Sequence, residues 1–144
     1  MMIAAPVASI HAQTVANSLS FGGKAIAIDM TSCSPENSAD GKSRAIVAAD
    51  SASGSSATLQ FSSLTPPAGT YATVADEDGL GEGKVIVAVG GRSFGGVFMA
   101  VPGQSVTVTR AGPRYAASFA GLTLIDMMSK APARQTVAGS FGCQ

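Results

Sequence analysis

QSVTVTR (104–110), AGP (111–113) and RYAASFAG (114–121) form the part of the chain that decides the fold. The first and third segments alternate apolar and polar residues with a period of two, as half-buried β-strands do. The valines of the first segment are predicted to face inward and its threonines outward. The short AGP segment has the composition of a turn, so the sequence predicts a β-hairpin here.

Two interpretations are open for the residues that follow this hairpin. Phe119, Leu122, Ile125 and Met128 recur every three residues, which suits a short helix or a 3₁₀ turn. We expect instead that the strand continues to about Leu124 and that a loop follows.

The last segment, TVAGSFGCQ (136–144), alternates again and predicts a closing strand. Val137, Phe141 and Cys143 share one face of this strand, which points the sulfur of Cys143 into the core. Gly139 lies on the same face, where its missing side chain would admit a neighbouring residue.

Cys33 and Cys143 are the two cysteines of the chain, separated by about 110 residues. Their number and spacing fit one long-range bridge formed in an oxidising compartment. They fit no zinc pattern, because the chain has no CxxC motif and one histidine. The alternative is two buried free thiols. We favour the bridge because Cys143 stands where a strand end would otherwise fray.

The rest of the chain repeats the same alternation between clusters of turn residues. Residues 44–50 are a continuous apolar run that fits either a buried strand or a helical segment, and the glycines at 95 and 96 predict a bulge or a bend. Further short strands are predicted at 18–21, 25–30, 57–61, 69–75, 84–90 and 92–101.

These segments predict an all-β domain over residues 18–144. Eight or nine short strands, each with one apolar face to cover, are typical of an antiparallel β-sandwich or a partly open barrel. We expect a single domain of this kind with one disulfide.

Residues 1–17 are predicted to be the remnant of a signal peptide or an N-terminal arm. The first thirteen are apolar, with small residues near Ala8 and Ala12, as at the end of a secretory signal. The alternative is a frayed terminus or an edge strand. A run this short does not cross a bilayer, which takes about twenty apolar residues, and we predict no transmembrane segment.

Composition argues against several functions. The nine basic and nine acidic residues are scattered, whereas nucleic-acid binding needs a basic face, so we expect no nucleic-acid partner. His11 is the one histidine and lies in the segment that could be removed, which argues against a nucleophile–histidine pair and against an imidazole metal site. We therefore expect a protein that is not an enzyme.

Asp76, Asp78 and Glu82 are the candidate metal ligands. They crowd into a glycine-rich segment, DEDGLGEG (76–83), and carboxylate oxygens in such a turn can wrap calcium. The segment does not match an EF-hand loop. The alternative, which we favour, is a solvated loop, so we expect no cofactor other than this calcium candidate.

The C-terminal stretch resembles the mycobacterial lipoprotein antigens of the LpqH type. That family places its first cysteine after an early strand, as Cys33 stands here, and its two cysteines are expected to pair. The family's lipid-bearing cysteine has no counterpart in this chain. The matching residues are Thr109, Arg110, Gly112, Tyr115, Gly121, Asp126, Met127, Pro132, Phe141 and Cys143.

This resemblance implies a bacterial, surface-exposed β-domain that binds or displays rather than catalyses. Together with the leader and the cysteines, it leads us to expect a secreted or cell-surface module, antigen-like or binding an unidentified surface or apolar ligand. The alternative is a structural subunit of a fibre, pilus or virion shell. The protein would then be a monomer in the first case, or self-assembling through its N-terminal arm in the second.

Overall fold

The computed structural model describes residues 17–33, 35–36, 43–128 and 133–143. The predictions made for His11 and for residues 1–16 lie outside these ranges. Asn17, the first described residue, accepts a hydrogen bond at its side-chain oxygen from the main-chain N–H of Gly142, at 3.3 Å.

The regular secondary structure of the described residues is nearly all β-strand, which confirms the predicted all-β class. Strands β5 to β12 have five residues or more each, β1 has four, and β2, β3 and β4 are shorter. One short 3₁₀ helix, η1 (Glu77–Gly79), interrupts them. The strands are β1 Ser18–Phe21, β2 Lys24–Ala25, β3 Met30–Ser32, β4 Pro35–Glu36, β5 Ser43–Asp50, β6 Ser55–Phe61, β7 Gly69–Thr73, β8 Lys84–Gly91, β9 Gly96–Ala100, β10 Ser105–Ala111, β11 Arg114–Asp126 and β12 Arg134–Gly142.

All these strands belong to one sheet, in the order β2-β1-β12-β11-β10-β7-β8-β6-β5-β3, with β4 beside β5 and β9 between β11 and β8. The expectation of a purely antiparallel arrangement is wrong at one pair, because β7 and β8 run parallel, with Ala72 beside Lys84. The chain does not reverse after β7. It passes through η1 and enters β8 in the same direction as β7, so the sheet is mixed.

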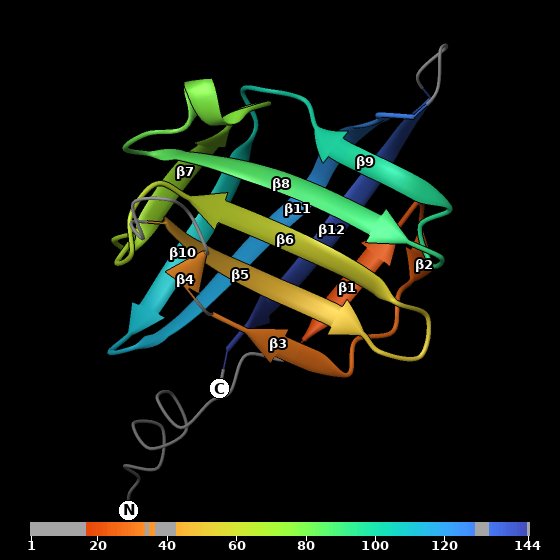
Figure 1. The fold of residues 1–144 in the computed structure, drawn as a ribbon, viewed down its shortest axis with the longest axis horizontal. Helices are drawn as coiled ribbons and strands as arrows, with labels where there is room; N and C mark the ends of the chain where they lie inside the picture. The colour runs from red at the N-terminus through yellow and green to blue at the C-terminus, as the bar shows by residue number, and fades with distance from the viewer. Residues whose placement is uncertain (1–16, 34, 37–42, 129–132, 144) are drawn as a thin grey trace, which may run out of the picture.

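The sheet folds onto itself to give two layers. In Figure 1, β8, β6 and β5 cross in front of β10, β11, β12 and β1. Strand β6 shows why the layers pack: Ala57, Leu59 and Phe61 are buried, while the residues between them are half-buried. This strict alternation matches the sequence prediction, and such one-sided strands must cover their apolar faces with a second layer.

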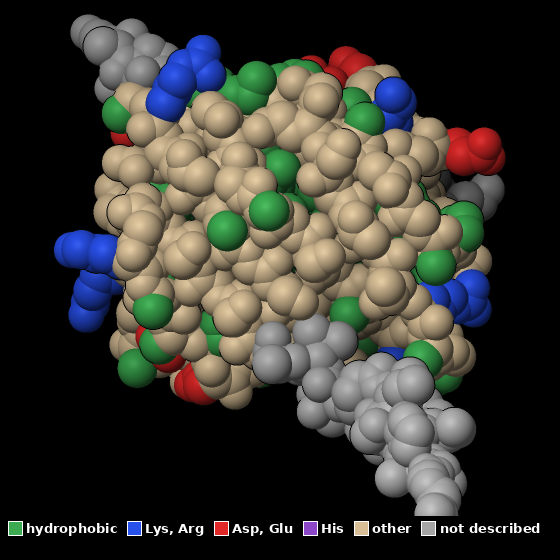
Figure 2. Space-filling view, turned by 180° about the vertical axis from the view of Figure 1, so that it is seen from behind, with side chains coloured by type: hydrophobic (Ala, Val, Ile, Leu, Met, Phe, Trp, Pro, Cys, Tyr) green, Lys and Arg blue, Asp and Glu red, His purple; other side chains and the backbone are tan. Residues whose placement is uncertain are grey.

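The outer face of the back layer is polar and almost uncharged. Figure 2 views the molecule from behind, and the Lys, Arg, Asp and Glu side chains visible there lie mainly around the periphery. Strand β10 contributes exposed threonines at 107 and 109, while Val106 and Val108 are buried, as predicted.

Strand β11 contains the irregularity that made its sequence ambiguous. Its pairing with β12 shifts register between Phe119 and Leu122, and Gly121 adopts a positive φ of 77° there. Such a β-bulge inserts an extra residue, so two inward-facing side chains lie three positions apart instead of two. The strand continues to Asp126, so the helical alternative is wrong.

Two other local predictions need correction. Residues 26–29 are not in a strand, and Met30 is 55% exposed, so the expected inward face of Ile26, Ile28 and Met30 is broken at its end. Gly95 lies in the tight turn between β8 and β9, where its φ is 74°, rather than in a bulge within one strand. The apolar run at 44–50 is strand β5.

A side chain fills the gap where β11 changes partners along one edge. That edge pairs with β10 up to Ser118 and with β9 from Leu124 onward. In between, the Thr123 N–H donates to Gln104 Oε1 at 2.7 Å, and Gln104 Nε2 donates to the carbonyls of Val101 and Thr123 at 2.7 and 3.0 Å. One main-chain bond spans this gap, from the Val101 N–H to the Thr123 carbonyl at 2.9 Å, and the amide group of Gln104 supplies the others.

The Cys33–Cys143 disulfide closes the opposite side of the molecule and confirms the predicted bridge. Cys33 follows β3, the last strand of the front layer, and Cys143 follows β12 of the back layer. The main chain of Tyr115 anchors the bridge: its carbonyl accepts from the Cys143 N–H at 3.0 Å, and its N–H points at Cys143 Sγ at 3.2 Å.

Two guanidinium groups flank the buried ring of Tyr115 beside this bridge. The Cζ atoms of Arg44 and Arg110 lie 5.0 and 5.4 Å from the ring centroid, within the range of cation–π attraction. Arg44 comes from β5 and also donates to the Cys33 carbonyl. The front and back layers are thus joined at this side by a covalent bond and by an arginine that reaches across it.

Removing the bridge is expected to destabilise the fold strongly. The chain-entropy model for a loop of 110 residues gives a loss of about 4–5 kcal/mol in the free energy of unfolding when both cysteines are changed to serine (Cys33→Ser with Cys143→Ser). Urea denaturation measures it, with the reduced wild-type protein as the control that must match the double variant. Equal midpoints for the oxidised and serine proteins would contradict a stabilising role.

The close approach of β1 to β12 predicts that Gly139→Ala is destabilising. A Cβ at Gly139 would lie 2.7 Å from the Ser18 carbonyl and 2.9 Å from a Leu19 methyl, and the backbone cannot yield cheaply. We expect a loss of about 1–3 kcal/mol in thermal or urea unfolding. Gly81→Ala is the matched control, because a Cβ there meets no atom within 4 Å and its φ is not positive. Equal stability of the two variants would contradict this packing.

Candidate functional site

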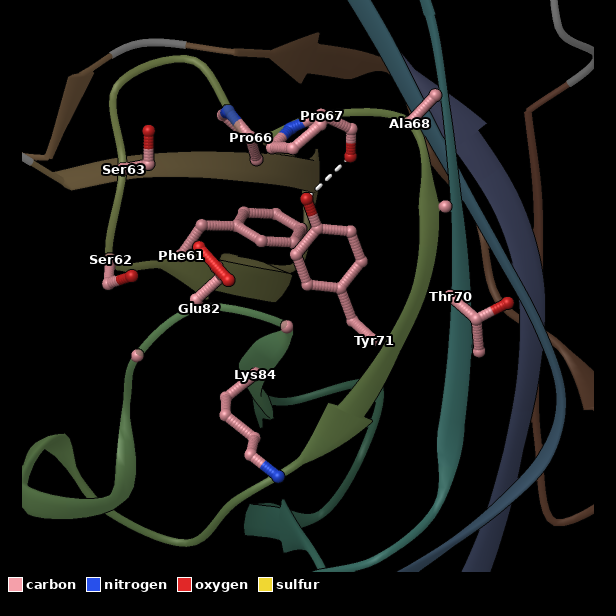
Figure 3. Close-up of a pocket in the computed structure, with 13 residues that line it drawn as sticks. Phe61, Ser62, Ser63, Pro66, Pro67, Ala68, Thr70, Tyr71, Glu82 and Lys84 are labelled. Atoms are coloured by element: carbon pink, nitrogen blue, oxygen red, sulfur yellow. Dashed lines mark hydrogen bonds between the residues drawn. The ribbon is translucent and has the colours of Figure 1, made fainter.

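An open cleft of about 500 Å³ lies beside the start of β7. Figure 3 shows its walls, which come from the end of β6, the loop that follows, the first residues of β7 and the segment leading into β8. The lining residues are Phe61, Ser62, Ser63, Pro66, Pro67, Ala68, Gly69, Thr70, Tyr71, Gly81, Glu82, Gly83 and Lys84.

The cleft exists because β8 begins late. This strand lies between β6 and β7 in the sheet, but its first residue is Lys84, beside Ala72 of β7. The preceding residues form a turn, in which the Lys84 N–H donates to the Gly81 carbonyl at 3.1 Å and Gly83 has a positive φ of 74°. The chain therefore leaves the sheet before it fills the space between the end of β6 and the start of β7.

Two aromatic side chains form the floor of the cleft. The rings of Phe61 and Tyr71 meet edge to face, with centroids 5.1 Å apart and planes at 80°. The Tyr71 hydroxyl donates a hydrogen bond to the Pro67 carbonyl, which ties the loop to the start of β7 (Figure 3). Both rings are buried, with 1% of Phe61 and 6% of Tyr71 exposed, so they form a packed apolar base beneath the cleft.

The environment of Tyr71 keeps its hydroxyl neutral. Burial raises the pKa of Tyr71 above its ordinary value of 10.0, and the charges of Tyr115 and Glu82 add to this effect. The phenol therefore stays a hydrogen-bond donor to Pro67 at neutral pH and does not act as a base.

One carboxylate and one ammonium group stand at the rim. Glu82 and Lys84 are both exposed and line the cleft. Within the described ranges, neither forms an ion pair, so both charges are available to a ligand. Their formal charges cancel, which leaves the rim neutral overall.

The structure separates the three acidic residues singled out in the sequence. Asp76 caps η1, where its Oδ1 accepts from the Gly79 N–H at 3.1 Å. Asp78 lies within η1, and Glu82 lies at the cleft. In the part of the chain that the structure describes, no three such side chains come close enough to hold a metal. Asp76 therefore caps η1, and the calcium site stays a prediction.

Sequence reasoning did not predict the cleft beside Pro66 and Pro67. A local signal was present, since one aromatic residue, Phe61, ends a strand and another, Tyr71, lies in the next strand. What was not visible is that β8 lies between these strands in the sheet and begins only at Lys84, beside Ala72.

Comparison of the chain with protein-family models, with curated proteins and with solved structures gave no match. Among the described residues, no helix has the length and apolarity needed to cross a membrane. The cleft and the disulfide are therefore the main basis for a functional proposal.

The raised pKa of Tyr71 predicts how stability changes at high pH. Tyr71→Phe loses the hydrogen bond to Pro67 and is expected to cost about 1 kcal/mol at neutral pH. Because the folded-state pKa lies above the unfolded one, the contribution of the phenol is complete below about pH 10 and is lost as the pH rises through the folded-state value. The stability difference between wild type and variant should therefore shrink above about pH 10.

Urea denaturation of both proteins across this pH range measures the effect. The difference in unfolding free energy between wild type and variant below pH 9 serves as the internal control, because Tyr71 does not titrate there in either the folded or the unfolded protein. A difference that stays constant up to pH 12 would contradict the burial of the phenol.

Proposed function

We propose that the protein is a secreted or cell-surface β-domain that binds a ligand in the cleft beside β7 and catalyses no reaction. The cleft carries this proposal. Its volume of about 500 Å³ lies within the range of ligand sites, about 300–1,000 Å³. An apolar aromatic floor with a few polar groups at the rim is also the usual composition of such sites.

The disulfide supports a location outside the cytoplasm. Bridges of this kind form and persist in oxidising compartments, and reducing systems keep cytosolic thiols unpaired. The Cys33–Cys143 bridge joins the two layers and is sequestered against Tyr115, as expected of a structural bond. The resemblance of the C-terminal stretch to LpqH-type antigens supports the same location.

The chemistry of the cleft supports binding over catalysis. Its lining residues include neither histidine nor cysteine. The Tyr71 hydroxyl donates its hydrogen bond to Pro67, and Glu82 is exposed at the rim. No nucleophile in the cleft is paired with a base among the hydrogen bonds that these lining residues form.

Binding is tested by recording amide NMR spectra while a panel of apolar aromatic compounds, oligosaccharides and short peptides is added. We expect at least one class to shift the resonances of residues 61–71 and 81–84 together. The Gly81→Trp variant should abolish the shifts, because an indole at this lining position fills the cleft without backbone strain. Gly81→Ala is the matched control and should bind as the wild type does.

Two results would contradict the proposal. One is a panel that leaves the cleft resonances unmoved. The other is concentration-dependent association of the full chain that disappears when residues 1–17 are removed, which is the behaviour expected of the alternative, a fibre or shell subunit. Size-exclusion chromatography over a range of concentrations distinguishes the two functions.

A further inference from the structure

Strand β7 directs an unused pair of main-chain hydrogen-bonding groups into the cleft. The Thr73 N–H donates to the Gln104 carbonyl, toward β10, while the Ala72 N–H donates to the Gly83 carbonyl, toward β8. Successive residues of a strand present their N–H and C=O groups to opposite edges. Thr70, two residues before Ala72, therefore presents its N–H and C=O to the side where the cleft lies.

No strand reaches Thr70 on that side. Strand β8 begins at Lys84 beside Ala72, and Gly83 is the last residue before it that bonds to β7. In the described part of the chain, no main-chain hydrogen bond reaches the N–H or the C=O of Thr70 from this side. Thr70 is exposed and lines the cleft, so β7 has a free edge there, and a free edge is a template for another strand.

The aromatic floor lies next to this free edge. Phe61 and Tyr71 form it, and the largely buried Pro66 borders it. A strand bonded to Thr70 would point alternate side chains toward this floor. The opposite charges of Glu82 and Lys84 give no preference for an acidic or a basic ligand, so the rim suits an uncharged segment.

We propose that the cleft accepts an extended, uncharged peptide segment, which adds to β7 as a strand and pairs with the main chain of Thr70. This inference rests on the proposed ligand-binding function and names the ligand class. A hydrocarbon chain would leave both Thr70 groups unpaired, whereas a peptide brings a donor and an acceptor at the spacing of a strand.

Synthetic peptides test this directly. The probes are acetylated and amidated hexapeptides in which Val, Leu or Phe alternates with Thr, and the readout is the shift of amide NMR resonances of residues 68–73. Two sets of N-methylated peptides are compared. In the first set, methylation of every other residue removes the N–H groups that would face β7. In the second set, methylation of the remaining residues removes the N–H groups that would face away from β7. We expect the first to weaken binding about tenfold and the second to leave it nearly unchanged.

A protein variant provides the matching test. Thr70→Pro removes the N–H that the peptide would use. It breaks no hydrogen bond of the fold. An edge strand also tolerates proline where the replaced N–H faces solvent. The variant should also weaken binding about tenfold. The control is the urea midpoint of this variant, which should match that of the wild type because no hydrogen bond of the fold is lost.

The outcomes separate this inference from the function on which it rests. Equal effects of methylation in the two sets of peptides would overturn strand addition, because the peptide would then bind by its side chains alone. Cleft shifts with a sugar or an aromatic compound but with no peptide would overturn the peptide class and leave the binding function standing. Cleft shifts with nothing in either panel would overturn both.

Discussion

The Cys33–Cys143 disulfide joins the two layers on a side of the protein where no described main-chain hydrogen bonds join them. On the other sides the two layers are continuous, through β7 at one corner and through β9 at another. Where β3, at one end of the strand order, approaches β12, the connection is the Cys33–Cys143 bridge, supported by Tyr115 and Arg44. The core depends on this constraint, because a sheet joined only at those two corners would expose the apolar faces of its outermost strands.

Features that depend on local pattern could be predicted from the sequence. The alternating burial of β6 and β10, the small residue required at Gly139 and the pairing of the cysteines all follow from which side of a strand each residue occupies. A period of two is a property of a few consecutive residues, and it persists whatever strand lies alongside.

Features that depend on neighbours could not be predicted. The parallel pairing of β7 with β8, the bulge at Gly121 and the use of Gln104 as a filler are decided by which strands meet. The cleft belongs to this group, since it arises from the position of Lys84 relative to β6 and β7. Phe119 and Leu122 illustrate the difficulty: their spacing resembles a helical turn until the partner strand reveals a register shift.

The side-chain hydrogen bonds of Gln104 make the sheet easier to open locally, at the place where β11 changes partners. Strand pairs separate only when many bonds break together, but an amide side chain can rotate about its own torsions and release three bonds at once. Solvent could then reach the backbone at Thr123 while the surrounding sheet stays folded, an opening far less costly than global unfolding. Amide exchange at this residue would accordingly report the motion of one side chain and not the integrity of the domain.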